Sequence, residues 1–162
     1  MSGPPPTPNV IKLRRGNPGK RKIRPEISPE QPQDVPEPPT FLNAYARDEY
    51  WRIAPELHRL GVLTVLDFNI VAAYAEACGT WRTACETLAT MRERDPTTGG
   101  LLIRSAVGDP RINPLLRVVH EAADSMLKFA GELGCTAIAR ARLASAGYTP
   151  PERGKFDGLL VE

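Results

Sequence analysis

The sequence is poor in the residues that build metal and thiol centres, with two histidines and three cysteines in 162 residues. The cysteines, Cys78, Cys85 and Cys135, are odd in number and form no Cys-x-x-Cys pair, so the pattern predicts neither a disulfide framework nor a tetrahedral zinc site. His58 and His120 each stand alone, without a second histidine or a cysteine one helical turn away. These shortages argue against metal chemistry and predict a reducing compartment.

Long apolar runs are also missing. No segment approaches the ~18 apolar residues that a membrane-spanning helix needs. Charges and prolines occupy the N-terminal region where a signal peptide would place its apolar stretch, so we expect a soluble, non-exported chain. A length of 162 residues suits one domain with a tail and excludes a multidomain enzyme.

The chain has no large excess of one charge sign, because it contains 21 Lys and Arg and 19 Asp and Glu. The distribution along the chain is uneven. Residues 1–25 carry seven cations and no acid, and taking these from the net +2 leaves −5 for the other 137 residues. The pattern predicts a basic arm in front of a mildly acidic body.

Proline marks the boundary of this arm. Residues 1–40 hold 11 of the 17 prolines and none of the ten aromatic residues. Such a segment buries too little apolar surface to offset its ordering entropy. We therefore predict an extended, mostly disordered arm over 1–40, basic up to Arg24 and then acidic and proline-rich.

Helical periodicity begins after residue 40. One apolar stripe predicts a first helix that Gly61 closes, and Thr64 is the expected N-cap of a second helix, with Asp67 in capping-box position. The first half of the second helix is apolar nearly all round, so we expect it to be buried on more than one side. The first stripe is Ala46, Tyr50, Ile53, Leu57 and Leu60; the second is Leu66, Ile70, Tyr74, Ala77, Trp81, Cys85, Leu88 and Met91.

Turn residues separate this pair from a second helical region. Residues 95–100 end the second helix, and residues 101–112 form either a short hairpin or an ordered loop. Asn113 and Pro114 are a strong helix start, and a short last helix is expected over 136–143. The stripe of the third helix is Leu115, Val119, Ala122, Met126, Phe129 and Leu133. The fold class is mainly α, a helical hairpin or bundle core over 41–145 between the arm and a flexible tail, 146–162.

No arrangement of residues indicates catalysis. Residues 16–21 superficially resemble a phosphate-binding loop, but they lack the required glycine spacing, the hydroxyl residue after Lys20 and a preceding strand. The carboxylates of Glu76, Glu86, Glu121 and Glu132 show no distinctive spacing and are expected on a solvated face. We predict no enzymatic activity and no cofactor.

The basic arm is the positive signal. Its cations, broken by Gly16, Pro18 and Gly19, suit a flexible segment that follows DNA phosphates rather than a continuous DNA-reading helix. The predicted DNA-binding residues are Lys12, Arg14, Arg15, Asn17, Lys20, Arg21, Lys22 and Arg24. A helix-turn-helix around residues 61–64 is the alternative, but from Val65 to Met91 the second helix carries only one cation, Arg82, so an antiparallel core hairpin is preferred.

A set of motifs occurs in a characteristic order. It starts with LRRGNPGKR at 13–21 and continues through a proline-rich stretch, Gly-Val-Leu-Thr at 61–64, Asn-Pro at 113–114 and Leu-Gly-Cys-Thr at 133–136. The chain resembles the small terminase subunit family of tailed phages, in the branch with an LRGNPGKR-like opening. The extra arginine in LRRGNPGKR, Cys135 in the last motif and Ala137 directly after it depart from that pattern.

The resemblance implies a non-catalytic protein of the host cytoplasm. It implies a homo-oligomeric ring of roughly eight to twelve subunits that binds double-stranded phage DNA at the packaging initiation site. It also implies regulation of the large terminase subunit, an ATPase and nuclease. Two alternatives remain open: a small helical transcription regulator, and a helical adaptor that does not bind DNA.

The tail ends in an apolar group formed by Phe156, Leu159, Leu160 and Val161. One interpretation folds this group back onto the body of the chain. The other makes it a short linear motif that docks on the large terminase subunit. These four residues are the predicted partner-binding set.

Overall fold

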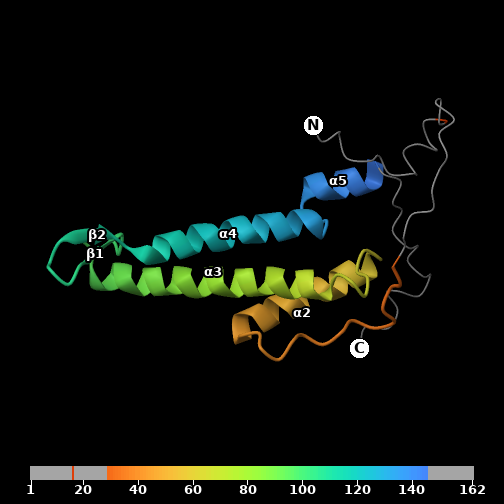
Figure 1. The fold of residues 1–162 in the computed structure, drawn as a ribbon, viewed down its shortest axis with the longest axis horizontal. Helices are drawn as coiled ribbons and strands as arrows, with labels where there is room; N and C mark the ends of the chain where they lie inside the picture. The colour runs from red at the N-terminus through yellow and green to blue at the C-terminus, as the bar shows by residue number, and fades with distance from the viewer. Residues whose placement is uncertain (1–15, 17–28, 146–162) are drawn as a thin grey trace.

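The computed structural model describes residue 16 and residues 29–145, and it confirms a mainly helical fold with a small antiparallel sheet (Figure 1). The element labels follow Figure 1. In chain order the elements are α2 (Ala44–Arg59), α3 (Phe68–Arg94), β1 (Leu102–Arg104), β2 (Pro110–Ile112), α4 (Pro114–Glu132) and α5 (Ala137–Ser145).

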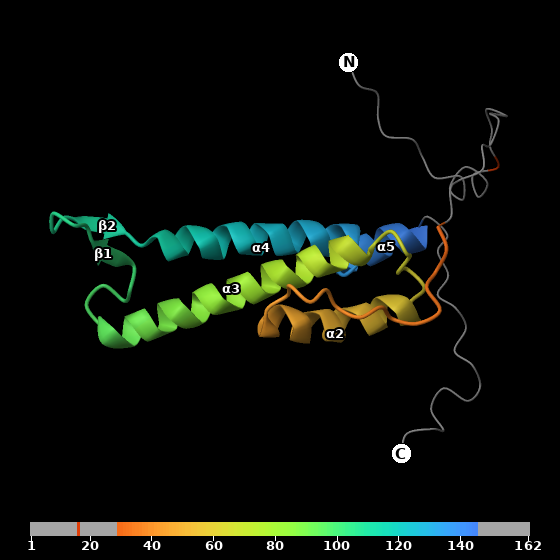
Figure 2. The ribbon, with the colours of Figure 1, turned by 60° about the horizontal axis from the view of Figure 1, so that its bottom comes forward.

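The long helix α3 organises the fold. Helix α2 packs antiparallel against its first half, and α4 returns along it from the hairpin β1–β2 (Figures 1 and 2). The two strands lie at one end of α3, and α5 lies at the other end, beside the α2–α3 connection. The result is a three-helix body from which the second half of α3 and the first half of α4 project as a two-helix arm.

Helix α2 follows the predicted pattern. The Asn43 side chain caps its N-terminus by accepting a hydrogen bond from the Ala46 amide at 2.9 Å. Gly61 ends the turn after the helix in the left-handed region, at φ +70°. The buried residues are Ala46, Tyr50, Ile53, Ala54 and Leu57, which confirms the apolar stripe up to Leu57.

Helix α3 begins later than predicted, because its N-cap is Asp67 and not Thr64. The Asp67 carboxylate accepts hydrogen bonds from the Thr64 amide at 3.0 Å and from its hydroxyl at 2.7 Å. These bonds close a separate turn over residues 64–67 before the helix starts. Thr64 and Asp67 pair as predicted, but their hydrogen bonds stabilise the α2–α3 connection and do not cap α3.

The buried face of α3 also differs from the predicted stripe. Leu66 is 68% exposed, and Ile70 and Trp81 are exposed as well. Small residues form the side that α2 covers, and the second half, beyond α2, buries only Ala84 and Leu88. The buried residues of the first half are Val71, Ala72, Tyr74, Ala75 and Gly79. Tyr74 and Leu88 of the predicted stripe are buried as expected, but most of the other buried residues are small, because close helix packing favours small side chains.

Gly79 marks the closest approach of α2 to α3. A Cβ atom at this position would lie 2.9 Å from the Ala46 nitrogen and 3.0 Å from the Ala46 Cβ. We expect Gly79→Ala to lower the free energy of unfolding by about 1–2 kcal/mol, because overpacking outweighs the better helix propensity of alanine. Chemical denaturation measures the change.

The matched control is Gly131→Ala on α4, where a Cβ would meet no atom within 4 Å. This variant should keep or slightly raise stability, by up to ~1 kcal/mol. Equal effects of the two substitutions would contradict the close α2–α3 contact.

Of the two alternatives for residues 101–112, the structure has the hairpin. Strands β1 and β2 pair antiparallel, with Leu102 opposite Ile112 and Arg104 opposite Pro110. Asn113 then caps α4 ahead of Pro114, as predicted, and its side chain is 2% exposed. Its Nδ2 donates to the Gly100 carbonyl at 2.8 Å, and its Oδ1 accepts from the Leu115 amide at 3.0 Å. This one side chain therefore fixes the hairpin to the start of α4.

The apolar stripe of α4 is only partly buried. Ala122 is buried within the helix, and Leu133, which follows it as C-cap, is buried too. The other stripe residues, Leu115, Val119, Met126 and Phe129, are half-buried. The last helix, α5, starts at Ala137, with the Thr136 hydroxyl accepting from the Ala139 amide at 3.1 Å.

Residues 29–40 differ from the expected flexible arm, because they lie in an extended path against α2 and the α2–α3 connection. The contacts are hydrogen bonds from Val65 N to Glu30 O at 3.1 Å, from Tyr50 Oη to Pro36 O at 3.1 Å, and between His58 Nε2 and Pro32 O at 2.9 Å. Prolines suit this path because they bring no backbone N–H that needs a partner. The amino-acid composition of this segment does not reveal that side chains of α2 hydrogen-bond the carbonyls of its prolines.

Candidate functional site

The predicted binding residues lie outside the part of the chain that the structure describes. This holds for the DNA-binding set, Lys12, Arg14, Arg15, Asn17, Lys20, Arg21, Lys22 and Arg24, and for the tail set, Phe156, Leu159, Leu160 and Val161. The described residues therefore give evidence only on other surfaces, those available for assembly and docking.

The α2–α3 pair is an antiparallel core hairpin. In a helix-turn-helix, the first half of α3 would be the part that enters the DNA groove. This half is covered by α2 and carries no cation up to Trp81. On α2, Arg52 pairs with Glu49 at 2.5 Å and Arg59 pairs with Glu56 at 2.7 Å. This arrangement does not resemble a major-groove reader, whose recognition helix is polar and exposed.

An exposed apolar face lies along α3 and α4. Trp81 is 39% exposed and Leu127 is 67% exposed, and half-buried apolar residues of α4 share this side by helical spacing. We call this surface the open face. Its residues are Trp81 and Cys85 of α3 with Leu116, Val119, Ala123, Met126 and Leu127 of α4. Exposed apolar patches of this kind mark interaction surfaces.

A groove of about 430 Å³ adjoins the open face between α2, α3 and α4. Aromatic and charged side chains line it together, with Trp81 and Met126 at the edge shared with the open face. The lining is Tyr45, Asp48, Glu49, Arg52, Tyr74, Cys78, Trp81, Arg82 and Met126. Aromatic and arginine side chains are the residues that most often dominate binding energy at protein interfaces.

Three groups that line this groove, Cys78, Tyr74 and Glu49, have shifted pKa values. Burial raises the pKa of Cys78 to about 11, so its thiol stays protonated near neutral pH. Burial also raises the pKa of Tyr74 well above its usual value. Burial opposes ionisation of Glu49, but its hydrogen bonds from Arg52 prevail and lower the pKa. A protonated thiol and a paired carboxylate do not form a nucleophile and its base.

The rim of the groove is tied together by a three-residue cluster. The Arg82 guanidinium lies 4.1 Å from the centre of the Tyr45 ring and donates to Glu86 at 3.0 Å. The Tyr45 hydroxyl donates to the same carboxylate at 2.7 Å. The cluster joins α2 to α3 and uses Glu86 as a structural acceptor.

The remaining carboxylates show no metal-binding geometry in the described ranges, 16 and 29–145, where no three His, Cys, Asp or Glu side chains group together. Glu121 and Glu132 are exposed, as expected for a solvated face. Glu76 differs from that expectation, because it is half-buried and its Oε2 is enclosed without a hydrogen-bond partner. Within the same residues no helix is long and apolar enough to cross a membrane.

The hairpin β1–β2, at the far end of the two-helix arm, is a second exposed apolar region. Val107 in its turn is 82% exposed, and Leu102 and Ile112, which face each other across the strands, are exposed too. The hairpin therefore presents apolar side chains to solvent in the isolated chain.

The described residues thus form a helical body with an exposed apolar face and a groove lined by aromatic and charged side chains. The chain belongs to the phage terminase small subunit family: the family described as "Phage terminase, small subunit" matches residues 46–148. This confirms the resemblance drawn from the motifs, over a region that excludes the basic opening. No curated protein and no solved structure matches the chain significantly.

Proposed function

We propose that this chain is the non-catalytic DNA-recognition subunit of a phage packaging motor, acting in the host cytoplasm. It binds double-stranded phage DNA at the packaging initiation site and brings that DNA to the large terminase subunit, whose ATPase and nuclease it regulates. Family membership carries this proposal. The seven uncompensated cations of residues 1–25 supply the electrostatic means.

Assembly into a homo-oligomeric ring is part of the proposal. The two-helix arm has a thin core, since its buried residues are essentially Ala84, Leu88, Asn113 and Ala122. The open face on α3 and α4 leaves Trp81 and Leu127 exposed to water in a monomer. A repeated head-to-tail contact through this face would bury them, and such a contact closes into a ring when the rotation permits. The family suggests roughly eight to twelve subunits.

DNA contacts are assigned to the basic opening. Arg14, Arg15, Lys20, Arg21 and Lys22 neutralise phosphates, and Lys12 and Arg24 extend the same charged segment. Asn17 makes at most a weak base or backbone contact. A ring would present many such arms to one duplex, so that individually weak contacts reinforce one another.

The tail is assigned to the large subunit. We expect deletion of residues 154–162 to abolish stimulation of the large subunit's ATPase, because Phe156, Leu159, Leu160 and Val161 would supply the anchors of a short docking motif. Stimulation is measured with purified large subunit and DNA. Ring mass and DNA affinity of the truncated chain should stay unchanged, and unaltered stimulation or loss of assembly would reject the assignment.

A further inference from the structure

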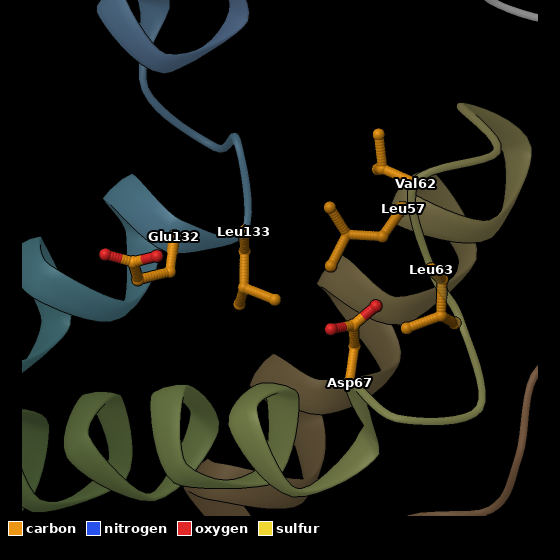
Figure 3. A pocket seen from close by; sticks show the side chains of 6 residues that line it. All are labelled: Leu57, Val62, Leu63, Asp67, Glu132 and Leu133. Atoms are coloured by element: carbon orange, nitrogen blue, oxygen red, sulfur yellow. The ribbon is translucent and has the colours of Figure 1, made fainter. Parts of the chain in front are cut away.

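A small apolar cavity lies at the end of the body where α5 begins. It has a volume of about 150 Å³ and opens to solvent between the end of α2, the α2–α3 connection and the end of α4. Figure 3 shows the Asp67 carboxylate directed toward the space between Leu57 and Leu133. The lining is Leu57, Val62, Leu63, Asp67, Glu132 and Leu133.

The walls of this cavity are preformed. Leu57, Leu63 and Leu133 belong to the buried core. Asp67 is held by its two hydrogen bonds from Thr64, at 3.0 and 2.7 Å. A cavity of about 150 Å³ is large enough to accommodate a benzene ring. Its leucine and valine walls suit the ring, and its two carboxylates lie where they can meet the ring's positive edge.

The charges at the cavity favour a neighbouring cation on the occupant. Asp67 and Glu132 are both acidic, and Glu132 is exposed without an ion-pair partner among the described side chains. An occupant with an aromatic ring and an adjacent lysine or arginine matches this arrangement. Within this chain, Lys155-Phe156 has that composition.

The length of the chain after α5 permits this pairing. Helix α5 starts four residues after Leu133 and has 9 residues, so its last residue, Ser145, lies about 13 Å along the helix from its start. Phe156 follows Ser145 by eleven residues, which span up to about 36 Å when extended. The reach exceeds the distance back to the cavity.

We infer that Phe156 inserts its ring into this cavity of its own chain and that Lys155 pairs with Glu132. The tail then covers apolar wall that is otherwise open to water. The inference does not rest on the packaging role, but it adds regulation to it. A docked Phe156 is not available to another protein, so the large subunit must displace the tail from the cavity before it binds that anchor.

The test uses the full chain with its four phenylalanines replaced by 4-fluorophenylalanine, observed by ¹⁹F NMR with a soluble gadolinium chelate. The Phe156 signal is assigned by its disappearance in Phe156→Leu. We expect its relaxation enhancement to be at least five-fold smaller than that of free 4-fluorophenylalanine. Full exposure of the Phe156 signal would overturn the inference.

Two sets of variants locate the docking site. Val62→Trp fills the cavity and should expose the Phe156 signal, whereas Val65→Trp, on the same connection but outside the cavity lining, should leave it protected. Lys155→Glu should lower the docked population about two- to five-fold, and adding Glu132→Lys should restore it. Protection that persists in Val62→Trp, or no recovery in the charge swap, would contradict this site.

A mixed assembly distinguishes the chain's own tail from that of a second copy. Fluorinated Val62→Trp chains are assembled with unlabelled wild-type chains. Continued exposure of Phe156 supports docking within one chain. Recovered protection would show that the tail occupies a neighbour's cavity and would overturn the inference.

Discussion

Replacing Arg14, Arg15, Lys20, Arg21 and Lys22 by glutamine is expected to remove most of the DNA affinity and most of its salt dependence. Five phosphates neutralised by one arm give a slope of log K against log salt of about −4.5, which is roughly a 500-fold loss of affinity between 50 and 200 mM salt. The glutamine variant keeps the arm's length and prolines, so it tests charge alone. Fluorescence anisotropy over a salt series measures both quantities.

Lys128→Gln is the matched control, because Lys128 is an exposed cation of α4 far along the sequence from the basic opening. It should change the slope by no more than about one unit. If the glutamine variant of the basic arm kept the wild-type DNA affinity and salt slope, DNA binding would have to be reassigned to the helical body.

Leu127→Glu is expected to dissociate the ring. A carboxylate placed in the centre of an apolar contact is desolvated without a partner, at a cost of several kcal/mol, which weakens each contact by 100-fold or more. Because Leu127 is 67% exposed in the single chain, the substitution should leave the helical fold intact. Native mass spectrometry and circular dichroism measure the two effects.

Lys128→Glu, at the adjacent but differently facing position of α4, is the control for this substitution and should assemble normally. A Leu127→Glu chain that still forms complete rings would exclude the open face as the contact surface. Loss of assembly in both variants would indicate a nonspecific charge effect.

Local signals in the sequence predicted the helices and some of their ends, although the start of α3 was placed too early. Asn113-Pro114 fixed the start of α4, and Gly61 fixed the turn after α2, because capping and left-handed turns depend on single residues. The hairpin was one of two alternatives that the sequence left open for residues 101–112. These features need no knowledge of the tertiary fold.

Features that depend on the packing partner were not predicted. The stripe through Leu66, Ile70 and Trp81 fits a helix with one apolar side, whereas α3 presents Ala72, Ala75 and Gly79 to α2. Residues 29–40 were assigned to the arm because composition does not show that Tyr50 and His58 would hydrogen-bond their carbonyls.

The candidate surfaces also divide into those that the sequence alone indicates and those that depend on the tertiary fold. The cavity near α5 combines residues 57–67 with 132–133, which only the antiparallel fold brings together. The open face likewise needs the α3–α4 pairing before Trp81 and Met126 become neighbours. The basic arm, by contrast, was evident from charge counting alone and stays a prediction.

The native mass of the full chain at micromolar concentration tests the central claim most directly. A chain of 17.8 kDa that forms a ring of roughly eight to twelve subunits gives a single species of about 140–210 kDa. A monomer of 17.8 kDa, or a simple dimer, would contradict the account.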